Sequence, residues 1–255
     1  MKRLLDPSFW LRALTHPLVL IGLVIDLAPI AGVILWGWGA LPLVMIYWME
    51  NVIAGVTTIP RIVISGASYG GFGLLAGLGL SAFFVVHYGM FCAVHGTFLV
   101  GLSAFSDPDK IQSLPFMDIP GMFQLGFNSG LHVDWMIYAI AAFQVLVLIW
   151  EFIFKGEWKT TNPMAEMFAP YSRIIVLHFG IFAGAAALFL LGQPMVGVLA
   201  LILFRVVWGI LTNSKRAGVT PLGEALGGYD KAMDQLKGRT DFQNLLKGTA
   251  PTSKS

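Results

Sequence analysis

The sequence contains few charged residues and almost no cysteine. Only 12% of its 255 residues are Asp, Glu, Lys or Arg, whereas a soluble domain carries about 25%. The net charge of +2 is small, and nothing in the sequence points to nucleic acid. The one cysteine, Cys92, excludes an internal disulfide and any CxxC metal-binding motif. Residues 1–16 lack the small-residue cleavage site of a signal peptide, so we expect the first apolar segment to be retained.

Apolar residues, by contrast, dominate the chain. They make up 56% of it, and the mean hydropathy is +0.75. Long uncharged stretches predict an all-α, polytopic membrane protein in contact with the lipid bilayer. We expect residues 1–211 to form a transmembrane helical bundle and residues 212–255 to form a polar cytoplasmic tail with a short amphipathic helix. The six expected spans are 17–38, 41–64, 77–105, 132–154, 171–191 and 194–211.

The third expected span is the one around which the others can be arranged. Residues 77–105 contain no Asp, Glu, Lys or Arg but hold two histidines, His87 and His95. An ionisable group inside a membrane is costly, so it marks a candidate site. Helical winding predicts two specialised faces. One face carries Phe84, His87, Phe91, His95 and Phe98, and the other carries the small residues Ala82, Gly89, Ala93 and Gly96.

The segments on either side of this span differ in character. We expect residues 65–76 to form a glycine-rich connector that precedes the third span. We expect the longer segment 106–131, which mixes aspartates with Phe and Met, to lie in the membrane interface as a lid.

The distribution of lysine and arginine predicts the orientation. In the six-span arrangement every basic cluster falls on one side, and only Lys110 falls on the other. Short cytoplasmic loops are enriched in these residues, so both termini are predicted to be cytoplasmic.

Estimated depth along the spans, at about 1.5 Å per residue, sorts the polar side chains into two groups. The inner group comprises Glu50, Asn51, His87, His178 and Arg205, with Asp26 and Glu151 as further members. The outer group comprises Cys92, His95, His132 and Asp134.

The inner group suggests one metal site with an open alternative. Eight residues place the backbones of His87 and His95 about 12 Å apart along a helix, so we expect them not to share one ion. Glu50, His87 and His178 come from three expected helices, as a site with two histidines and one carboxylate needs. Alternatively, a buried ion pair between Glu50 and Arg205 would occupy the carboxylate without a metal.

The outer group suggests a weaker second site made of His95, Cys92 and His132. His95 follows Cys92 by three residues, and a thiolate would favour a soft metal. We expect Asn51, Arg173, Arg205 and Asp26 to act as supporting residues. The cofactor could be a transition metal ion or a haem, although the sequence has no c-type haem attachment motif.

Three segments carry a resemblance to a known family. WMEN at Trp48–Asn51, HYGMFCAVHG at His87–Gly96 and PYSRIIVLH at Pro170–His178 resemble a family of uncharacterised bacterial multi-pass membrane proteins, classed as a domain of unknown function. The likeness leaves out the polar tail. It implies a location in the bacterial inner membrane and no established activity, and it places Glu50 and Arg173 among the motif residues together with the three histidines.

Three functions therefore remain open from the sequence. We favour an integral membrane protein that binds a metal ion or a metal-containing cofactor among its central helices. Alternatively, prolines at 29 and 60 and acidic groups at mid-depth would suit a transporter of small solutes or a proton-coupled carrier. The third alternative is an assembly or scaffold protein whose polar groups only fix the register of the helices.

Overall fold

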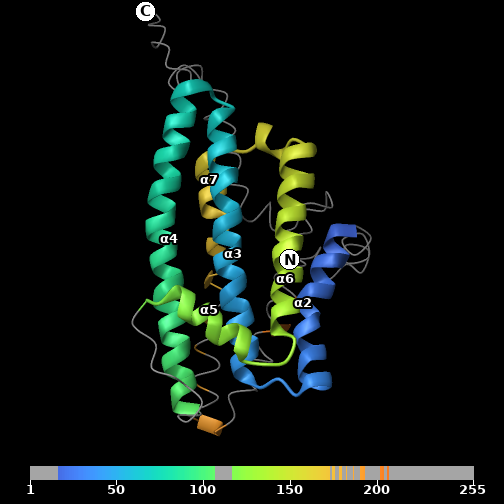
Figure 1. Cartoon of the computed structure of the whole chain (residues 1–255). Coiled ribbons are helices and arrows are strands. Elements are labelled where there is room, and N and C mark those ends of the chain that lie inside the picture. The colour runs from blue at the N-terminus through green and yellow to red at the C-terminus, as the bar shows by residue number, and fades with distance from the viewer. Residues whose placement is uncertain are drawn as a thin grey trace, which may run out of the picture.

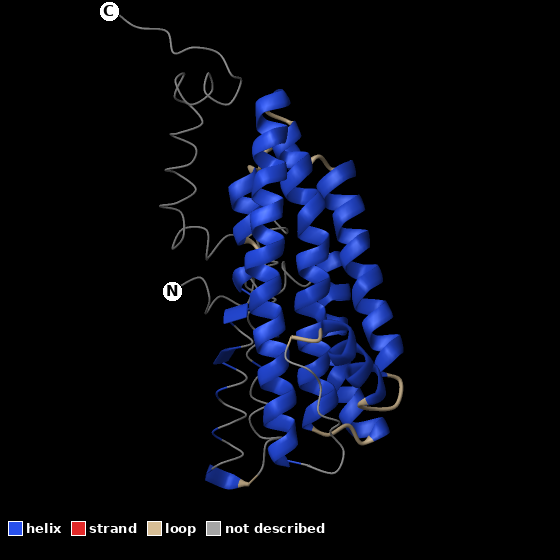
Figure 2. Cartoon of the chain, turned by 60° about the vertical axis from the view of Figure 1, so that its left-hand side comes forward, coloured by secondary structure: helices blue, strands red, loops and turns tan. Residues whose placement is uncertain are grey.

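The computed structural model describes residues 17–106 and 117–172, and then positions 174, 175, 178, 179, 182, 186, 190–192, 202, 203 and 206. Throughout this part of the chain the regular elements are helices, and no strand occurs among them (Figure 2). The prediction of an all-α fold is confirmed there. The predicted amphipathic helix of the tail, residues 212–255, lies outside the described residues.

Four helices are long and apolar enough to cross a membrane. They are α2 (Pro17–Trp36), α3 (Ala40–Ala67), α4 (Gly70–Ser106) and α6 (Val133–Val147), which continues as a π-helix, η3 (Leu148–Phe154). The described positions from 171 to 191 are helical, and so are positions 202, 203 and 206. Gly192 lies in a bend. Most of the predicted sixth span, 194–211, lies outside the described residues.

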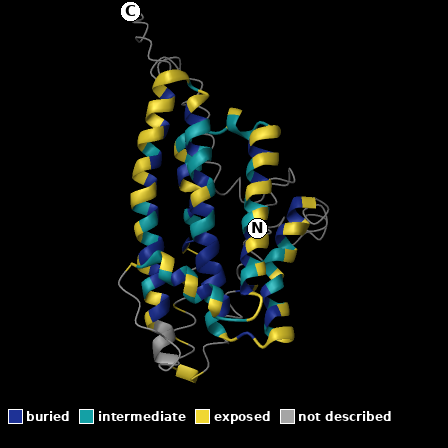
Figure 3. Ribbon diagram, viewed as in Figure 1, coloured by how far each residue is buried: buried dark blue, intermediate teal, exposed yellow. Residues whose placement is uncertain are grey.

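Helix α3 lies at the centre of the bundle (Figure 1), where it contacts α4, α5, α6 and α7. Its first half is almost entirely buried (Figure 3). Leu43, Met45, Ile46, Trp48 and Met49 have no exposed surface. Burial of apolar surface stabilises a fold by about 25 cal/mol per Å². Because these side chains are fully buried, the fold is organised around α3 rather than around α4. From the sequence alone, α4 is the helix predicted to hold that central position.

Helices α3 and α4 form a tight antiparallel hairpin, so the predicted glycine-rich connector at 65–76 is mostly helical. Helix α4 begins at Gly70, and only Ser68 and Tyr69 separate it from α3. A Cβ atom on Gly66 would lie 2.6 Å from the Gly73 carbonyl oxygen, and one on Gly77 would lie 3.1 Å from that of Ile62. These glycines allow the two backbones to touch, as small residues do between membrane helices.

The small-residue face predicted on α4 is only partly a packing face. Ala93 and Gly96 are buried, and a Cβ atom on Gly96 would meet Trp48 of α3 at 2.8 Å. Ala82 is exposed, and among the described residues no atom lies within 4 Å of a Cβ atom placed on Gly89. The row shares one side of the helix, but among the described residues only its end at Ala93 and Gly96 is buried.

Two sets of contacts define the two ends of the bundle. At one end the Trp38 indole Nε1 donates to the Leu131 carbonyl oxygen at 2.8 Å, which joins the α2–α3 connection to the start of α6. At the other end the Tyr69 hydroxyl donates to the Thr161 carbonyl oxygen at 3.1 Å. The α3–α4 turn and the segment after η3 therefore lie at the same end.

Part of the predicted lid is a short helix, α5 (Ile119–Asn128), which lies across α3 and α4 in the lower part of Figure 1. The Asp118 side chain caps its first turn by accepting from the Gly121 amide at 3.0 Å. Met122 of α5 is buried against the core of α3. The preceding residues 107–116 lie outside the described residues.

An ionic cluster fastens the segment after η3 to α3. Arg61 lies 3.5 Å from Glu166 of α7 (Pro163–Phe168) and 3.9 Å from Glu157 of the 3-10 helix η4 (Glu157–Lys159). Its guanidinium also lies 4.7 Å above the centre of the Phe152 ring in η3. Arg61 thus fixes α7, which leads directly into the helical residues that begin at Tyr171.

Candidate functional site

Two pairs of polar side chains join α4 to the chain that follows α7. The imidazole of His87 lies 2.9 Å from the Tyr171 hydroxyl. Two turns further along, Nε2 of His95 lies 2.9 Å from Nε2 of His178. His87 and His95 are eight residues apart on α4, and their partners Tyr171 and His178 are seven residues apart, so the two separations are nearly equal. The two segments therefore run side by side in the same direction over these turns.

The His95–His178 pair has an unusual hydrogen-bonding arrangement. Nδ1 of His95 lies 2.5 Å from the carbonyl oxygen of Phe91, one turn earlier on its own helix. Nδ1 of His178 lies 2.9 Å from the carbonyl oxygen of Ile174, also four residues earlier. The two rings are nearly perpendicular, at 82°, with centroids 4.3 Å apart.

These partners fix the tautomer of both rings. A carbonyl oxygen can only accept, so each Nδ1 must carry the hydrogen. A neutral imidazole protonated at Nδ1 has a lone pair on Nε2. The two Nε2 lone pairs lie on nitrogens only 2.9 Å apart and repel, so the arrangement calls for a cation shared by the two nitrogens. That cation can be one extra proton or a metal ion.

The surroundings of the pair are mainly aromatic and apolar. The side chain of Phe91 stacks on His95, with ring centroids 6.1 Å apart, and Phe182 lies 6.4 Å from His178. His95 itself is only 9% exposed. In such surroundings an electrostatic interaction with an ion is stronger than in water.

His87 lies in a separate place, as the spacing along the helix predicted. The Phe91 ring stands between the two histidines of α4, 5.1 Å from the ring of His87. Since His95 pairs with His178, His87 lies about 12 Å along the helix from that pair. The expected meeting of His87 with His178 therefore does not occur; His178 contacts His95 instead.

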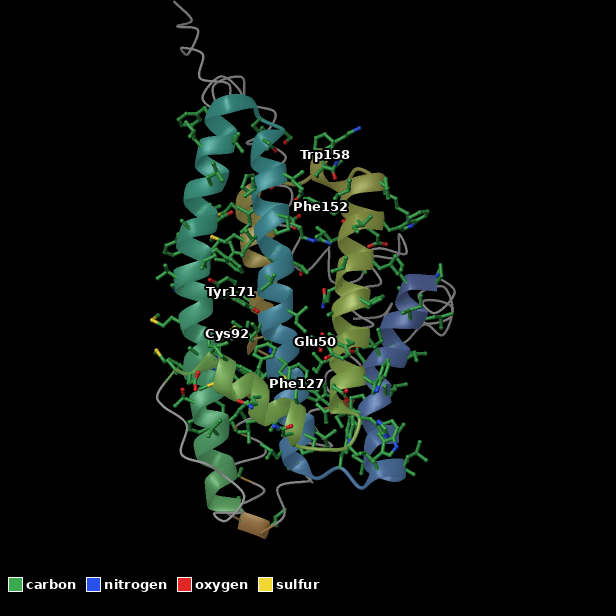
Figure 4. The ribbon with its side chains drawn as sticks, in the orientation of Figure 1. Glu50, Cys92, Phe127, Phe152, Trp158 and Tyr171 are labelled. Carbon is green, nitrogen blue, oxygen red and sulfur yellow. The ribbon has the colours of Figure 1, made fainter. Side chains whose placement is uncertain are left out.

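Glu50 is buried on α3 at 5% exposure, in the element that forms the core. In Figure 4 it is labelled between α3 and α6, whereas Cys92 and Tyr171 are labelled near α4. Its neighbour Asn51 is also buried; its side-chain amide donates to the Tyr47 carbonyl oxygen at 3.0 Å. The backbone carbonyl oxygen of Asn51 accepts a hydrogen bond from the Tyr88 hydroxyl. Both residues thus belong to the packing of α3.

The other acidic members of the inner group lie on the far helices. Asp26 is half-buried in α2, and Glu151 is buried in the π-helix, 4.0 Å from the Lys155 ammonium. Arg173 and Arg205, which we expected to support the site, lie outside the described residues. The predicted Glu50–Arg205 ion pair is therefore still a prediction.

The outer group is not gathered in one place. Cys92 is buried, and its carbonyl oxygen accepts from the Trp48 indole at 2.7 Å. His132 is exposed at the start of α6 with a positive φ of 64°, and its ring lies 5.1 Å from that of Trp36. Asp134 lies in the first turn of the same helix. Over the described residues, no three His, Cys, Asp or Glu side chains are grouped so that they could hold one metal ion.

Sequence reasoning selected the histidines but missed Tyr171 as the partner of His87. The available signal was the matched spacing of the two motif segments. A tyrosine seven residues before His178 corresponds to a histidine eight residues before His95. The pairing follows from that match once the two segments are placed side by side.

Comparisons with known proteins give one match. The model of a family described as a family of unknown function (DUF6498) matches residues 10–220. No curated protein and no solved structure matches the chain.

Proposed function

This chain belongs to DUF6498, a family of unknown function, and we propose that it is an integral membrane protein that binds a metal ion between His95 and His178. We further propose six spans with both termini in the cytoplasm, in the inner membrane of a bacterium. The four long apolar helices support a lipid environment.

One observation carries the metal proposal. Both imidazoles give their Nδ1 hydrogen to a backbone carbonyl and present Nε2 to the same point. Metal-binding histidines almost always donate their other ring N–H to a carbonyl or carboxylate, which fixes the ring and raises its basicity. Here two rings from different segments are oriented in this way, each by a carbonyl oxygen of its own segment.

The proposal moves the site from the residues selected by sequence alone. His178 keeps its role, His95 takes the place of His87, and Glu50 is no longer a ligand. His87 uses Nδ1 to contact Tyr171, so it lacks the carbonyl anchor that orients the other two rings. The aromatic ring of Phe91 separates it from the proposed site.

The competing interpretation is purely structural. A separation of 2.9 Å is that of an ordinary hydrogen bond, so the pair could hold one extra proton and tie α4 to the segment after α7. Polar contacts of this kind join membrane helices with about 0.6 kcal/mol each on average. The two interpretations differ in whether purified protein retains a metal.

Elemental analysis of detergent-purified protein tests the proposal. We expect about one equivalent of a transition metal per chain, and we expect His95→Ala and His178→Ala each to lose most of it. His132→Ala is the matched control, because that histidine is exposed and contacts Trp36 instead. If the folded wild-type protein takes up no metal, or if both variants keep it, the pair is structural.

A further inference from the structure

We infer that the ion held by His95 and His178 is monovalent and soft, with Cu(I) as the natural occupant, rather than a divalent cation. This inference rests on the proposed metal site and adds the chemical class of its ligand. It follows from the number of ligands, from their charge and from the surroundings of the pair.

The number of ligands is the first argument. Two imidazole nitrogens converge, and across the described residues no third His, Cys, Asp or Glu completes a group with them. Structural zinc takes four protein ligands and catalytic zinc takes three. Calcium takes 6–8 oxygens, and magnesium demands octahedral geometry. A closed-shell monovalent ion such as Cu(I) or Ag(I) is satisfied by two donors in line.

The charge of the ligands is the second argument. Both imidazoles are neutral when they bind a metal, so the complex keeps the full charge of the ion. The cost of placing an ion in a medium of low dielectric constant rises with the square of its charge. A divalent ion without a carboxylate partner would therefore pay about four times the penalty of a monovalent one. His95 is nearly buried beside the Phe91 ring and His178 is half-buried, so the site is partly shielded from water and the difference favours the monovalent ion.

The geometry requires both side chains to rotate, because the ring centroids now lie 4.3 Å apart and rings in line with an ion lie further apart. With metal–nitrogen bonds of about 2 Å, two nitrogens in line with an ion are about 4 Å apart. The two Nε2 atoms, now 2.9 Å apart, would have to separate by about 1 Å. Each ring is held by a carbonyl of its own helix, so both can keep their Nδ1 contacts while the side chains rotate apart.

Imidazole alone accepts several metals, so the test compares ions directly. Detergent-purified, metal-free wild-type protein is titrated with Cu(I) under anaerobic conditions, in competition with a chromophoric chelator. Ag(I) and Zn(II) are titrated in the same way. We expect about one equivalent of Cu(I) or Ag(I), bound at least about 100-fold more tightly than Zn(II). His95→Ala should weaken Cu(I) binding by at least about tenfold, while His132→Ala leaves it unchanged.

His178→Met sharpens the comparison. A thioether is a soft ligand that suits Cu(I) and is poor for Zn(II), so this variant should keep Cu(I) within about tenfold of wild type. Loss of Cu(I) as complete as in His178→Ala would overturn the inference. Zn(II) binding as tight as Cu(I) would overturn it too, while leaving the proposed metal site intact. A folded, monodisperse wild-type protein that binds none of the three ions would refute the proposed function itself.

Discussion

At the scale of single residues, the hydrogen-bond partner of each histidine nitrogen separates the histidines of α4. His95 is anchored through Nδ1 to its own helix and presents Nε2 to His178. His87 instead uses Nδ1 to contact the Tyr171 hydroxyl. The sequence identified both as costly intramembrane groups. It could not assign their partners, because these depend on the register between α4 and a segment some 80 residues later.

Residue-scale packing is best tested at Gly96. A Cβ atom there would meet the Met122 sulfur and the Trp48 ring, both from the buried core. We expect Gly96→Leu to lower stability by about 1–3 kcal/mol, the usual cost of overpacking. Thermal unfolding in detergent measures this as a lower melting temperature.

Gly89→Leu is the matched control, since among the described residues nothing lies within 4 Å of a Cβ atom at that position. Sequence reasoning alone predicts the same loss at both glycines, because they share one side of the helix. Equal destabilisation of the two variants would show that the face around Gly89 is also packed.

At the scale of elements, the contacts around Arg61 hold the segment that delivers Tyr171 and His178. Arg61 contacts α7, η4 and the Phe152 ring together. The sequence marked Arg61 only as a basic residue at the end of a span. Its partners Glu157 and Glu166 follow about 100 residues later, so no local pattern predicted the cluster.

The two arms of this cluster should differ in strength. The Arg61–Glu166 pair is 3.5 Å long and its side chains are 16% and 12% exposed, while Glu157 is 41% exposed and 3.9 Å away. A double-mutant cycle with Arg61→Met and Glu166→Gln should give a coupling of about 1 kcal/mol. The cycle with Glu157→Gln should give less, because exposed pairs are screened. A stronger coupling to Glu157 would mean that α7 is held by other contacts.

The same end of the bundle offers a pH-dependent contact. Tyr69 lies between α3 and α4, and its hydroxyl donates to the Thr161 carbonyl oxygen. Burial raises the pKa of Tyr69 above its usual range. The folded state therefore holds this proton more firmly than the unfolded state. The contribution to stability is fully present below about pH 10 and is lost as the pH rises further.

Tyr69→Phe should consequently cost about 0.5–1.5 kcal/mol at neutral pH through the lost hydrogen bond. It should also reduce the fall in stability above about pH 10. Tyr138→Phe is the control, because Tyr138 is 57% exposed. Unfolding in denaturant at several pH values measures both effects. An identical alkaline loss in wild type and Tyr69→Phe would assign that loss to other groups.

At the scale of the whole molecule, the described helices alternate in direction as a chain crossing a membrane repeatedly must. The Trp38–Leu131 contact joins the end of α2 to the start of α6, and the Tyr69–Thr161 contact joins the opposite ends. Apolar length and charge pattern were sufficient to predict all four of these helices within a few residues, except for the start of α4. Gly66, Gly70 and Gly73 suggested a connector, whereas close contact between α3 and α4 is what requires Gly66 and Gly73.

The orientation of the molecule in the membrane is the last prediction. Arg61, Lys155 and Lys159 lie at one end of the bundle, because Arg61 contacts η4 and the Tyr69 turn contacts Thr161. Short loops rich in Lys and Arg stay in the cytoplasm, so we expect this end to be cytoplasmic. A reporter active only outside the cytoplasm should be silent after Ser255 and after Lys155, and active near Gln112. If the reporter is silent at Lys155 but active at Ser255, the four described helices keep the proposed orientation. The number of spans after α6 would then be odd, not two. Activity at Lys155 would invert the whole bundle.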